Sequence, residues 1–506
     1  MTRTLEEVGR GLAPLRPPRS LRPGERIHVL GAGGAGASQA VLLAARAGAW
    51  VSGCDTGGPS PYTEAAQAMG LPLVWGHDPS HVATPTGAPL VDRLAVTKSL
   101  TSVRPDHPEL AAAHGAGVVV EAWQQVVADV AHTRDQRLVA ITGTHGKSTT
   151  SGWVAHLLTV AGRDPSAAIG ALLPASLTGG PPATVRWGSG DTMVVEADEY
   201  ADNFGPYRPS VAIVLNAEWD HPDVFADRAA VVAMLEGWLR AAADARPTLV
   251  VNVGDAGGRE LFSRLDDWPG RIVRFALLDD GEPESPAEVR GRVVAEARAG
   301  DALRIEGLPE GSLTAGLHLP RRHYAADALA VAAAGLALGV DASSIVASLE
   351  GFGGVGRRLE LKGEPRGVTV LDDYGHHPTA IRATLDAVRQ RYPGRRLWAV
   401  YEPLTFHRTA AMLQEFATVL AAADRAVVAD IWANRDPDTT ITSAQALADA
   451  TTAAVGGAWR AAAPGSPEAT ADWLAAAVAP GDVVLVMGGG RSYVIAARLV
   501  ELLRAT

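Results

Sequence analysis

The sequence predicts an α/β protein built from several domains. Short apolar runs alternate with alanine-rich helical stretches from Ile27 onward, a pattern typical of βαβ units and parallel sheets. Two glycine-rich turns, 31–36 and 143–146, each follow an apolar run. A chain of 506 residues is too long for one hydrophobic core, so two to four domains are expected.

The domain boundaries are predicted from where this alternation stops and resumes. Residues 1–24 are rich in Pro and Arg, and we expect a loose leader there. The pattern starts again at the second glycine turn and once more after the hinge-like stretch Gly351–Gly356. The predicted domains are 25–134, 135–355 and 356–506.

Individual elements follow from the apolar runs and their spacing. The predicted strands are 27–30, 50–53, 138–140, 192–196, 211–216, 248–252, 368–371, 397–401, 426–430 and 483–487. The predicted helices are 35–47, 149–158, 324–338 and one that begins near Thr379. Residues 280–315 are charged and broken by Gly and Pro, which predicts a peripheral antiparallel hairpin region.

Composition excludes several classes of protein. A net charge of −11 and a pI near 5.7 argue against a nucleic-acid-binding surface. Cys54 is the only cysteine, so an internal disulfide is excluded and a reducing cytoplasm fits. The N-terminus lacks the apolar core of a signal peptide, and no apolar run approaches the ~20 residues of a membrane helix. We therefore expect a cytoplasmic protein that binds neither nucleic acid nor membrane.

The second glycine turn predicts a phosphate site. The run Ile141 to Thr149 reads ITGTHGKST, so a buried strand enters a turn that ends in Lys-Ser at a helix start. Such a turn points backbone N–H groups at one spot beside the positive end of a helix dipole. Lys147 adds a charge for the β- and γ-phosphates, and the Ser148 hydroxyl suits Mg²⁺. An ordinary strand–helix turn is the weaker alternative, because Lys-Ser stands at the helix start.

The first glycine turn predicts a diphosphate site. Residues 31–36 satisfy G-x-G-x-x-G, and Asp55 ends the next strand, where a carboxylate can bind a ribose hydroxyl. Read alone, this pattern suggests a dehydrogenase that uses NAD or FAD. A UDP-sugar also carries a diphosphate, and the second nucleotide turn argues against a simple dehydrogenase.

Polar residues follow other predicted strands. Glu196-Ala-Asp-Glu199 comes after one strand, and Asn216 to Pro222, which contains Asp220-His221, comes after the next. With Ser148 they offer a hydroxyl, a carboxylate and an imidazole at strand ends, although Mg²⁺ prefers oxygen ligands. The alternatives are a solvated loop and a surface turn. Near the C-terminal side, Asp372 to Pro378 reads DDYGHHP between a strand and a helix, where a polar helix cap is the alternative.

Together these motifs resemble those of the Mur ligases over residues 26–500. The resemblance rests on GAGGAGAS at 31–38, GTHGKS at 143–148, EADE at 196–199, NAEWDH at 216–221 and DDYGHHP at 372–378. It implies three domains: a Rossmann-like UDP-binding domain, a central P-loop ATPase domain with a mostly parallel sheet, and a Rossmann-like C-terminal domain. No lysine lies between Lys147 and Lys362, which favours the alanine-adding branch over siblings with a carbamylated lysine.

That branch implies an ATP-driven ligase of peptidoglycan precursor synthesis. It would join UDP-N-acetylmuramate to L-alanine through an acyl phosphate, using ATP and Mg²⁺ (or Mn²⁺), as a monomer or homodimer. The alternatives are a peptide-recycling ligase, a divergent paralogue with another acceptor, and a UDP-sugar-binding protein without turnover. The intact Lys147, Ser148, Glu196 and His221 count against the last.

The resemblance also implies roles for individual residues. It places Lys147, His221, His376 and Arg408 in catalysis and Ser148, Glu196 and His221 at the metal. It implies ATP contacts for Gly143, Thr144, His145, Gly146, Lys147, Ser148, Thr149, His323, Arg357 and Asp373. It implies UDP-sugar contacts for Gly31, Gly33, Gly34, Gly36, Ser38, Asp55 and His77, and amino-acid contacts for Tyr374, His376 and Arg408.

Some positions depart from the family pattern. Cys54 stands where Ser is usual, Tyr200-Ala201 replaces Ser-Asp, and Asp327 replaces Asn. Thr405 occupies a position where an arginine would pair with a carboxylate, and Thr cannot supply that charge. These departures leave the acceptor amine open.

Overall fold

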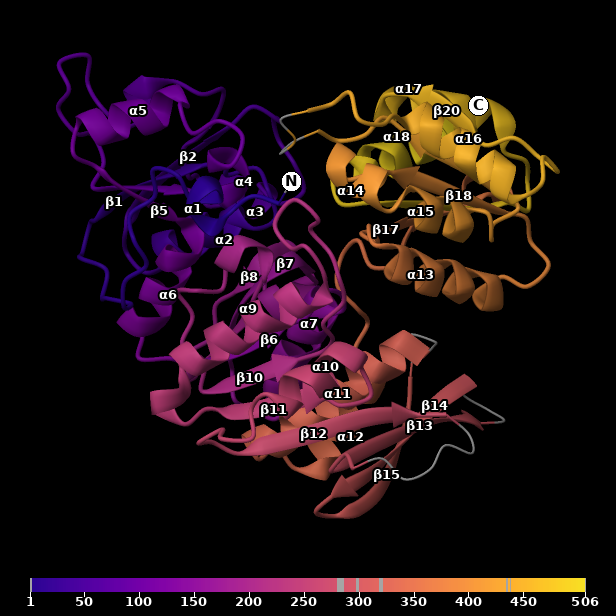
Figure 1. Cartoon of the computed structure of the whole chain (residues 1–506), viewed down its shortest axis with the longest axis horizontal. Helices are drawn as coiled ribbons and strands as arrows, with labels where there is room; N and C mark the ends of the chain where they lie inside the picture. Colours follow the sequence, from indigo (N-terminus) through magenta and orange to yellow (C-terminus); the bar gives the residue numbers. More distant parts are fainter. Residues whose placement is uncertain are drawn as a thin grey trace. The chain divides into compact units, whose positions relative to one another are not determined.

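The computed structural model describes residues 2–279, 286–296, 300–317, 322–433, 436 and 438–505. It contains three sheets with flanking helices, in a three-domain α/β fold (Figure 1). The chain forms two compact units. The first, Met1–Trp219 with Val224–Val355, holds the first two sheets; the second, Asp220–Asp223 with Gly356–Thr506, holds the third.

The first sheet has five parallel strands in the order β3-β2-β1-β4-β5. The strands are β1 (Arg26–Leu30), β2 (Trp50–Asp55), β3 (Leu73–Trp75), β4 (Arg93–Val96) and β5 (Val119–Ala122). The helices are α2 (Ala37–Arg46), α3 (Glu64–Ala68), η1 (Pro79–His81), α4 (Lys98–Thr101), α5 (Pro108–Gly115) and α6 (Trp123–Thr133). The strand order reverses between β1 and β4, which puts the turn after β1 at a topological switch point, where such sheets bind ligands.

The expectation of a loose leader was wrong. Residues 5–8 form the short helix α1 (Leu5–Val8), whose N-cap Thr4 and Glu7 make a capping box. Val8 and Leu21 are buried, and the Thr101 hydroxyl donates to the carbonyl of Val8. The arginines of the leader are not a solvated run, because several of them pair with buried carboxylates.

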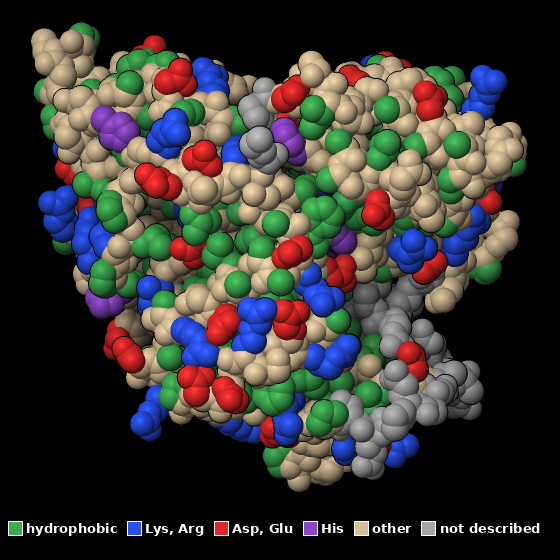
Figure 2. All heavy atoms as spheres, viewed as in Figure 1, with side chains coloured by type: hydrophobic (Ala, Val, Ile, Leu, Met, Phe, Trp, Pro, Cys, Tyr) green, Lys and Arg blue, Asp and Glu red, His purple; other side chains and the backbone are tan. Residues whose placement is uncertain are grey.

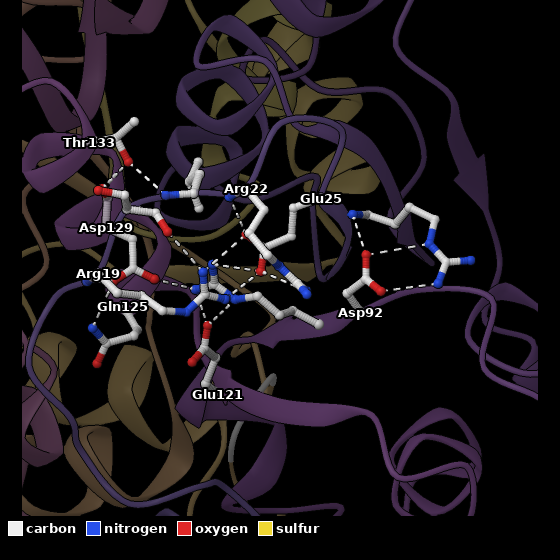
Figure 3. Close-up of polar contacts among 12 residues, drawn as sticks. Arg19, Arg22, Glu25, Asp92, Glu121, Gln125, Asp129 and Thr133 are labelled. Atoms are coloured by element: carbon white, nitrogen blue, oxygen red, sulfur yellow. Dashed lines mark hydrogen bonds and ion pairs between the residues drawn. The ribbon is translucent and has the colours of Figure 1, made fainter.

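Those pairs centre on Asp129 of α6, which is fully buried (Figure 3). Its carboxylate accepts from Arg93 Nη2 at 2.7 Å, from Arg16 Nη2 at 2.6 Å and from the Arg19 backbone N–H at 2.9 Å. Glu121 of β5 pairs with Arg93 and Arg16, so the leader is tied to both β5 and α6. Removing one partner of such a buried network leaves an uncompensated charge, which costs about 3–5 kcal/mol.

The second sheet has ten strands in the order β15-β14-β13-β12-β11-β10-β6-β9-β7-β8. The strands are β6 (Arg137–Thr142), β7 (Ser166–Leu173), β8 (Ala183–Arg186), β9 (Thr192–Glu196), β10 (Val211–Val214), β11 (Thr248–Asn252), β12 (Ile272–Leu278), β13 (Val289–Glu296), β14 (Gly300–Leu308) and β15 (Gly311–Gly316). The helices are α7 (Lys147–Val160), α8 (Ala175–Thr178), η2 (Tyr200–Asp202), α9 (Arg228–Ala241), η3 (Ala243–Ala245), α10 (Ala256–Ser263), α11 (Arg322–Leu338) and α12 (Ala342–Gly351). β7, β9, β6, β10, β11, β12 and β13 are parallel, and β8, β14 and β15 add antiparallel pairs at the edges.

The predicted hairpin region is antiparallel, but it is not a separate layer. β13 pairs in parallel with β12, so β13, β14 and β15 continue the central sheet outward. Residues 280–285 and 297–299 of that region lie outside the described residues.

The third sheet has six strands in the order β16-β17-β21-β18-β19-β20, all parallel except β16. The strands are β16 (Glu360–Gly363), β17 (Thr369–Asp373), β18 (Leu397–Glu402), β19 (Arg425–Ala429), β20 (Ala462–Gly465) and β21 (Val483–Gly488). The helices are η4 (Pro365–Gly367), α13 (Pro378–Arg391), α14 (Phe406–Ala411), α15 (Leu413–Leu420), α16 (Ala444–Ala454), α17 (Pro467–Ala477) and α18 (Ser492–Ala505). The four strands predicted here are all present.

Apolar burial stabilises each domain more than surface charge does. Trp153 of α7, 1% exposed, stacks on Phe352 with ring centroids 4.7 Å apart, between α7 and the end of α12. Figure 2 shows acidic and basic side chains interspersed over the drawn face of the first unit. Exposed pairs such as Arg240 with Glu236 contribute about 0–1 kcal/mol each, less than one buried aromatic ring. None of the described helices is both long and apolar enough to cross a bilayer.

Candidate active site

The second glycine turn connects β6 to α7, and α7 begins at Lys147. Gly143 and Gly146 have φ angles of 142° and 83°, a region that favours glycine. A Cβ on Gly146 would also lie 2.6 Å from the Asp327 carboxylate. These glycines let the turn fold tightly at the N-terminus of a 14-residue helix, where backbone N–H groups and the helix dipole favour an anion.

Lys147 lies among carboxylates. Its ammonium donates to Glu199 Oε2 at 2.9 Å and to the Gly143 carbonyl at 2.6 Å, and Asp198 lies 4.0 Å away. Burial acts to lower the pKa of Lys147, but the carboxylates of Glu199, Asp198 and Glu196 outweigh it and raise that pKa above its ordinary value. The side chain therefore carries a fixed positive charge beside the turn.

Residues after β10 hold the glycine turn in place. The Asn216 side chain accepts from the His145 backbone N–H at 3.1 Å and donates to the His145 carbonyl at 3.0 Å. The Thr144 hydroxyl donates to the Glu218 carbonyl and accepts from the Glu218 N–H. The motif at 216–218 thus fixes the turn through both side chain and backbone.

Ser148 and Glu196 supply the oxygen atoms that a divalent cation prefers. Ser148 is in the first turn of α7 and is buried, and Glu196 ends β9, the neighbour of β6 in the sheet. Glu196 Oε2 accepts from the Gly170 N–H at 2.6 Å, which fixes the carboxylate at the strand end. A hydroxyl and a carboxylate fit Mg²⁺. The third predicted ligand, His221, belongs to the second unit.

Lys98 is a residue that the sequence analysis did not single out. From α4 its ammonium donates to the carbonyls of Ala201 and Asp202 at 2.7 and 2.9 Å. Both of those residues have positive φ, in the segment just after Glu199. Burial lowers the pKa of Lys98 to about 8. The sequence feature that could have drawn attention to Lys98 is the scarcity of lysine, since the chain has only three.

The first glycine turn is organised by a carboxylate. Asp55, at the end of β2, accepts from the backbone N–H of Gly33 at 2.9 Å and of Gly57 at 2.7 Å. A Cβ on Gly33 would lie 2.9 Å from that carboxylate, and one on Gly36 would lie 2.8 Å from the Trp123 ring. Gly31, with φ of 85°, turns the chain out of β1. Glycine is therefore required at positions 33 and 36, where a side chain would collide with Asp55 or Trp123, and it is favoured at position 31 by the backbone conformation.

Two predicted UDP-sugar residues have partners elsewhere in the first unit. The Ser38 hydroxyl is buried inside the first unit and lies 3.0 Å from the Thr184 hydroxyl of β8. His77 Nδ1 lies 3.2 Å from the Cys54 thiol. Gly34 lies in the turn with Gly31 and Gly33, and its N–H donates to the Gly31 carbonyl.

In the second unit, Arg357 and Asp373 organise the end of β17. The Arg357 guanidinium is buried and donates to Asp372 at 3.2 Å, to the Gly488 carbonyl at 2.9 Å and to the Ser492 hydroxyl at 2.7 Å. Asp373 accepts from the backbone N–H groups of Leu359 and Gly375. Both side chains therefore fix the turn that carries Tyr374.

Arg408 and Asp220 form a buried ion pair within the second unit. Arg408, 1% exposed, donates from Nη2 to Asp220 Oδ1 at 2.7 Å, and the same nitrogen lies 3.1 Å from His221 Nδ1. Burial acts to raise the pKa of Asp220, but the Arg408 charge outweighs it and holds that pKa well below its usual range. Nε and Nη1 of Arg408 have no hydrogen-bond partner among the described residues. Buried donors of this kind are rare, so they favour a polar ligand.

His376 is a neutral imidazole beside this pair. Burial, followed by the Arg408 charge, holds the pKa of His376 well below its ordinary value. Nδ1 lies 3.0 Å from the Tyr374 carbonyl and donates to it, which leaves Nε2 as an acceptor. Of the remaining predicted residues, Thr149 is buried in α7, and His323 is in the first turn of α11 with its side chain outside the described part.

Comparison with known proteins identifies the family. Three family profiles match in succession: "Mur ligase family, catalytic domain" at 26–135, "Mur ligase middle domain" at 141–335 and "Mur ligase, glutamate ligase domain" at 357–490. Among curated proteins, the UDP-N-acetylmuramate–L-alanine ligase of Streptomyces avermitilis is 36% identical over 480 residues, covering 94% of this chain and 97% of its own. The enzyme of that name from Mycolicibacterium vanbaalenii is 37% identical over 476 residues, which cover 92% of this chain and 94% of its own.

Solved structures share the fold. A UDP-N-acetylmuramate-alanine ligase from Thermotoga maritima matches with a TM-score of 0.76 at 24% identity, over 95% of this chain and 99% of that one. A murein peptide ligase from Psychrobacter arcticus matches with a TM-score of 0.73 at 23% identity, over 96% and 99%. From three successive profile matches and curated relatives above 30% identity over nearly the whole length, we conclude that the chain belongs to the Mur ligase family.

Proposed function

We propose that this protein is an ATP-dependent ligase that joins the lactyl carboxylate of UDP-N-acetylmuramate to L-alanine in peptidoglycan precursor synthesis. The observation that carries the proposal is Lys147, held by carboxylates at the N-terminus of α7 in a glycine turn. The curated relatives, which carry the name of this reaction, support the choice of substrates. Cytoplasmic location and a monomer or homodimer belong to the same proposal.

The first step is proposed to occur at the second glycine turn. The substrate carboxylate attacks the γ-phosphorus of ATP, an acyl phosphate forms, and ADP leaves. The backbone N–H groups at the N-terminus of α7, with Lys147, stabilise the charge on the transferring phosphoryl group. Ser148 and Glu196 would hold Mg²⁺, which when bound neutralises phosphate charge, and His221 is proposed to bind a second divalent ion. Thr149, His323, Arg357 and Asp373 are proposed to contact or position the nucleotide.

The second step is proposed to use residues of the second unit. The alanine amine attacks the acyl carbon, phosphate leaves, and a proton leaves the amine. Nε and Nη1 of Arg408 are donors suited to the alanine carboxylate. His376 Nε2 can accept a hydrogen bond from the amine, and Tyr374 lies beside it. The low pKa of His376 makes it a weak base, so we assign it to positioning the amine.

The first glycine turn is the proposed UDP site. Residues 31–36 lead into the start of α2, and Asp55 fixes their conformation by accepting from the N–H of Gly33. A diphosphate fits such a turn. Ser38 and His77 are assigned to the support of this turn, since both side chains have protein partners.

An assay of ADP formation tests the proposal and its main alternative. UDP-N-acetylmuramate and ATP are held at saturation while L-alanine, other amino acids and the tripeptide of murein are supplied in turn. The expected result is ADP formation that requires both UDP-N-acetylmuramate and L-alanine. Preference for the tripeptide would instead identify a peptide-recycling ligase, for which the change to Thr405 is the motivating observation.

A further inference from the structure

Three potential metal ligands surround the single thiol of the chain. The Cys54 side chain, from β2, lies in the interior of the first domain. Beside it are the side chains of His28 of β1, His81 of η1 and Glu109 of α5. Their ligand atoms all lie within 4.8 Å of one another. Cys54 and Glu109 are fully buried, and the His81 side chain is 16% exposed. The cluster is thus enclosed, with one ligand at the surface.

The spacing of these atoms suits a tetrahedral metal ion. Cys54 Sγ lies 3.2 Å from His28 Nε2 and 3.3 Å from Glu109 Oε2, and His28 Nε2 lies 3.9 Å from that same oxygen. His81 Nδ1 lies 2.9 Å from Glu109 Oε1. Zinc bonds of about 2.0–2.3 Å require edges of roughly 3.3–3.8 Å between ligand atoms. His28, Cys54 and Glu109 already stand near these separations, and His81 lies within 4.8 Å of all three.

Hydrogen bonding alone satisfies this cluster poorly. A thiol has one weak donor, yet Cys54 Sγ is within 3.4 Å of His28 Nε2, His77 Nδ1 and both oxygens of Glu109. The thiol proton can serve only the Glu109 carboxylate, so His28 and His77 can contact the sulfur only through weak N–H···S hydrogen bonds. A cation would bind His28 Nε2, the Cys54 thiolate and the Glu109 carboxylate more strongly than these hydrogen bonds do.

The surrounding contacts orient the ligands as they do around known metal ions. His28 Nδ1 lies 2.8 Å from the Ser52 hydroxyl, which leaves Nε2 directed at Cys54. The Asp78 backbone N–H donates to Glu109 Oε1 at 2.7 Å. Metal-binding imidazoles and carboxylates commonly have such outer partners.

We propose that His28, Cys54, His81 and Glu109 form a structural zinc site in the first domain, with His77 beside the thiol. Nitrogen and sulfur ligands select zinc over magnesium, which takes oxygen. The Cys54 carbonyl accepts from the N–H groups of Gly31 and Ala32, so the ion would fix the strand end from which the first glycine turn is held. The site lies in a different domain from the second glycine turn and does not depend on the proposed reaction.

Cobalt binding tests this site sharply, because Cys54 is the only cysteine. Full-length protein without a histidine tag is treated with a chelator and then titrated with Co²⁺ or Zn²⁺. A thiolate-to-cobalt charge-transfer band in the near ultraviolet can come from Cys54 alone. We expect one equivalent of bound metal by elemental mass spectrometry and a higher melting temperature with Zn²⁺ than with Mg²⁺.

Variants separate coordination from folding. Cys54→Ser should abolish the band, and His81→Gln, at the surface end of the cluster, should weaken Zn²⁺ binding at least tenfold while leaving the fold intact by circular dichroism. His132→Gln changes an exposed histidine of the same domain and should bind metal like the unmodified protein. A folded protein that shows no thiolate band, or equal zinc affinity in the His81 and His132 variants, would overturn the proposal.

Discussion

The charged side chains beside the second glycine turn are more completely paired than those at the strand ends of the third sheet. At the central sheet, Lys147, His145 and Asn216 each hydrogen-bond to another part of the same site. At the third sheet, Glu402 Oε2 and two nitrogens of Arg408 are buried without a partner among the described residues. The first arrangement is preorganised for charge on a phosphate, and the second retains the capacity to bind a polar ligand.

This difference predicts that substitutions in the two regions impair different steps of the proposed reaction. Lys147→Ala should have the largest effect, a loss of at least about a hundredfold in kcat, because the charge on the transferring phosphoryl group loses its main cation. Steady-state ADP formation at saturating substrates measures it. Lys362→Ala, which removes a half-buried lysine paired with Glu360, is the matched control. A folded Lys147 variant with normal kcat would remove the basis of the assignment.

Arg408→Ala should mainly weaken the binding of L-alanine. Hydrogen bonds to a charged group contribute about 1.5–3 kcal/mol, so KM for L-alanine should rise roughly ten- to a hundredfold. Arg389→Ala, which changes an arginine paired at the surface with Asp424, serves as control. An unchanged KM for alanine would show that the partnerless nitrogens do not receive the amino acid.

Glu199→Gln tests the pairing at the central sheet. Removing the carboxylate leaves the Lys147 ammonium with the Gly143 carbonyl and the more distant Asp198, so the ligand-free protein should lose roughly 1–3 kcal/mol of stability. ATP should restore part of this loss, because phosphate oxygens replace the carboxylate and binding adds stability. The shift in melting temperature on adding ATP should therefore be larger in the variant than in the original protein. A smaller shift would mean that Glu199 supports nucleotide binding directly.

Glu402→Gln tests the incompletely paired carboxylate of the third sheet. Burial raises the pKa of Glu402 to about 7, despite the backbone N–H of Arg491. Because the folded pKa lies above the unfolded value, Glu402 contributes stability below about pH 4.5 that is lost as pH rises toward 7. Denaturant unfolding measures the free energy of unfolding at pH 5 and at pH 8. Its decrease between these pH values should be smaller in the Gln variant than in the original protein, by on the order of 2 kcal/mol. Glu415→Gln, at an exposed position of α15, should decline like the original protein; equal declines in both variants would contradict the burial argument.

The smallest effect is expected at Thr405, one of the positions that depart from the family pattern. Its φ of 67° strains a β-branched residue, yet its hydroxyl accepts from the Arg408 N–H and caps α14. Thr405→Gly exchanges the cap for relief of strain, so stability should change by less than about 1 kcal/mol. Thr405→Ala keeps the strain and loses the cap, and it should be less stable than the Gly variant in thermal unfolding. The reverse order would show that strain at this position is negligible.

The ten strands predicted from apolar runs are all present, because buried parallel strands are continuous apolar runs, and the two glycine turns were found from their fixed spacing. Other strands, among them β3, β4, β5 and β20, were not predicted. The leader was mispredicted because Arg16 and Arg19 look like solvated charges in the sequence. Their partners are Asp129, which is distant in the sequence, and Glu25, which no motif marks, and only the fold places these carboxylates beside them. The pairing of Lys147 with Glu199 and of Lys98 with two carbonyls could not be predicted either. Each depends on tertiary contact between segments that no local pattern relates.

Positional isotope exchange in ATP tests the central claim most directly. ATP labelled with oxygen-18 in the β,γ-bridge is incubated with UDP-N-acetylmuramate and no amino acid, and reversible phosphoryl transfer moves the label to a nonbridging position. If Lys147 serves the first step and Arg408 only the second, exchange should require UDP-N-acetylmuramate, persist in Arg408→Ala and vanish in Lys147→Ala. Exchange that survives in the Lys147 variant but is lost in the Arg408 variant would contradict the division of roles between the two sheets.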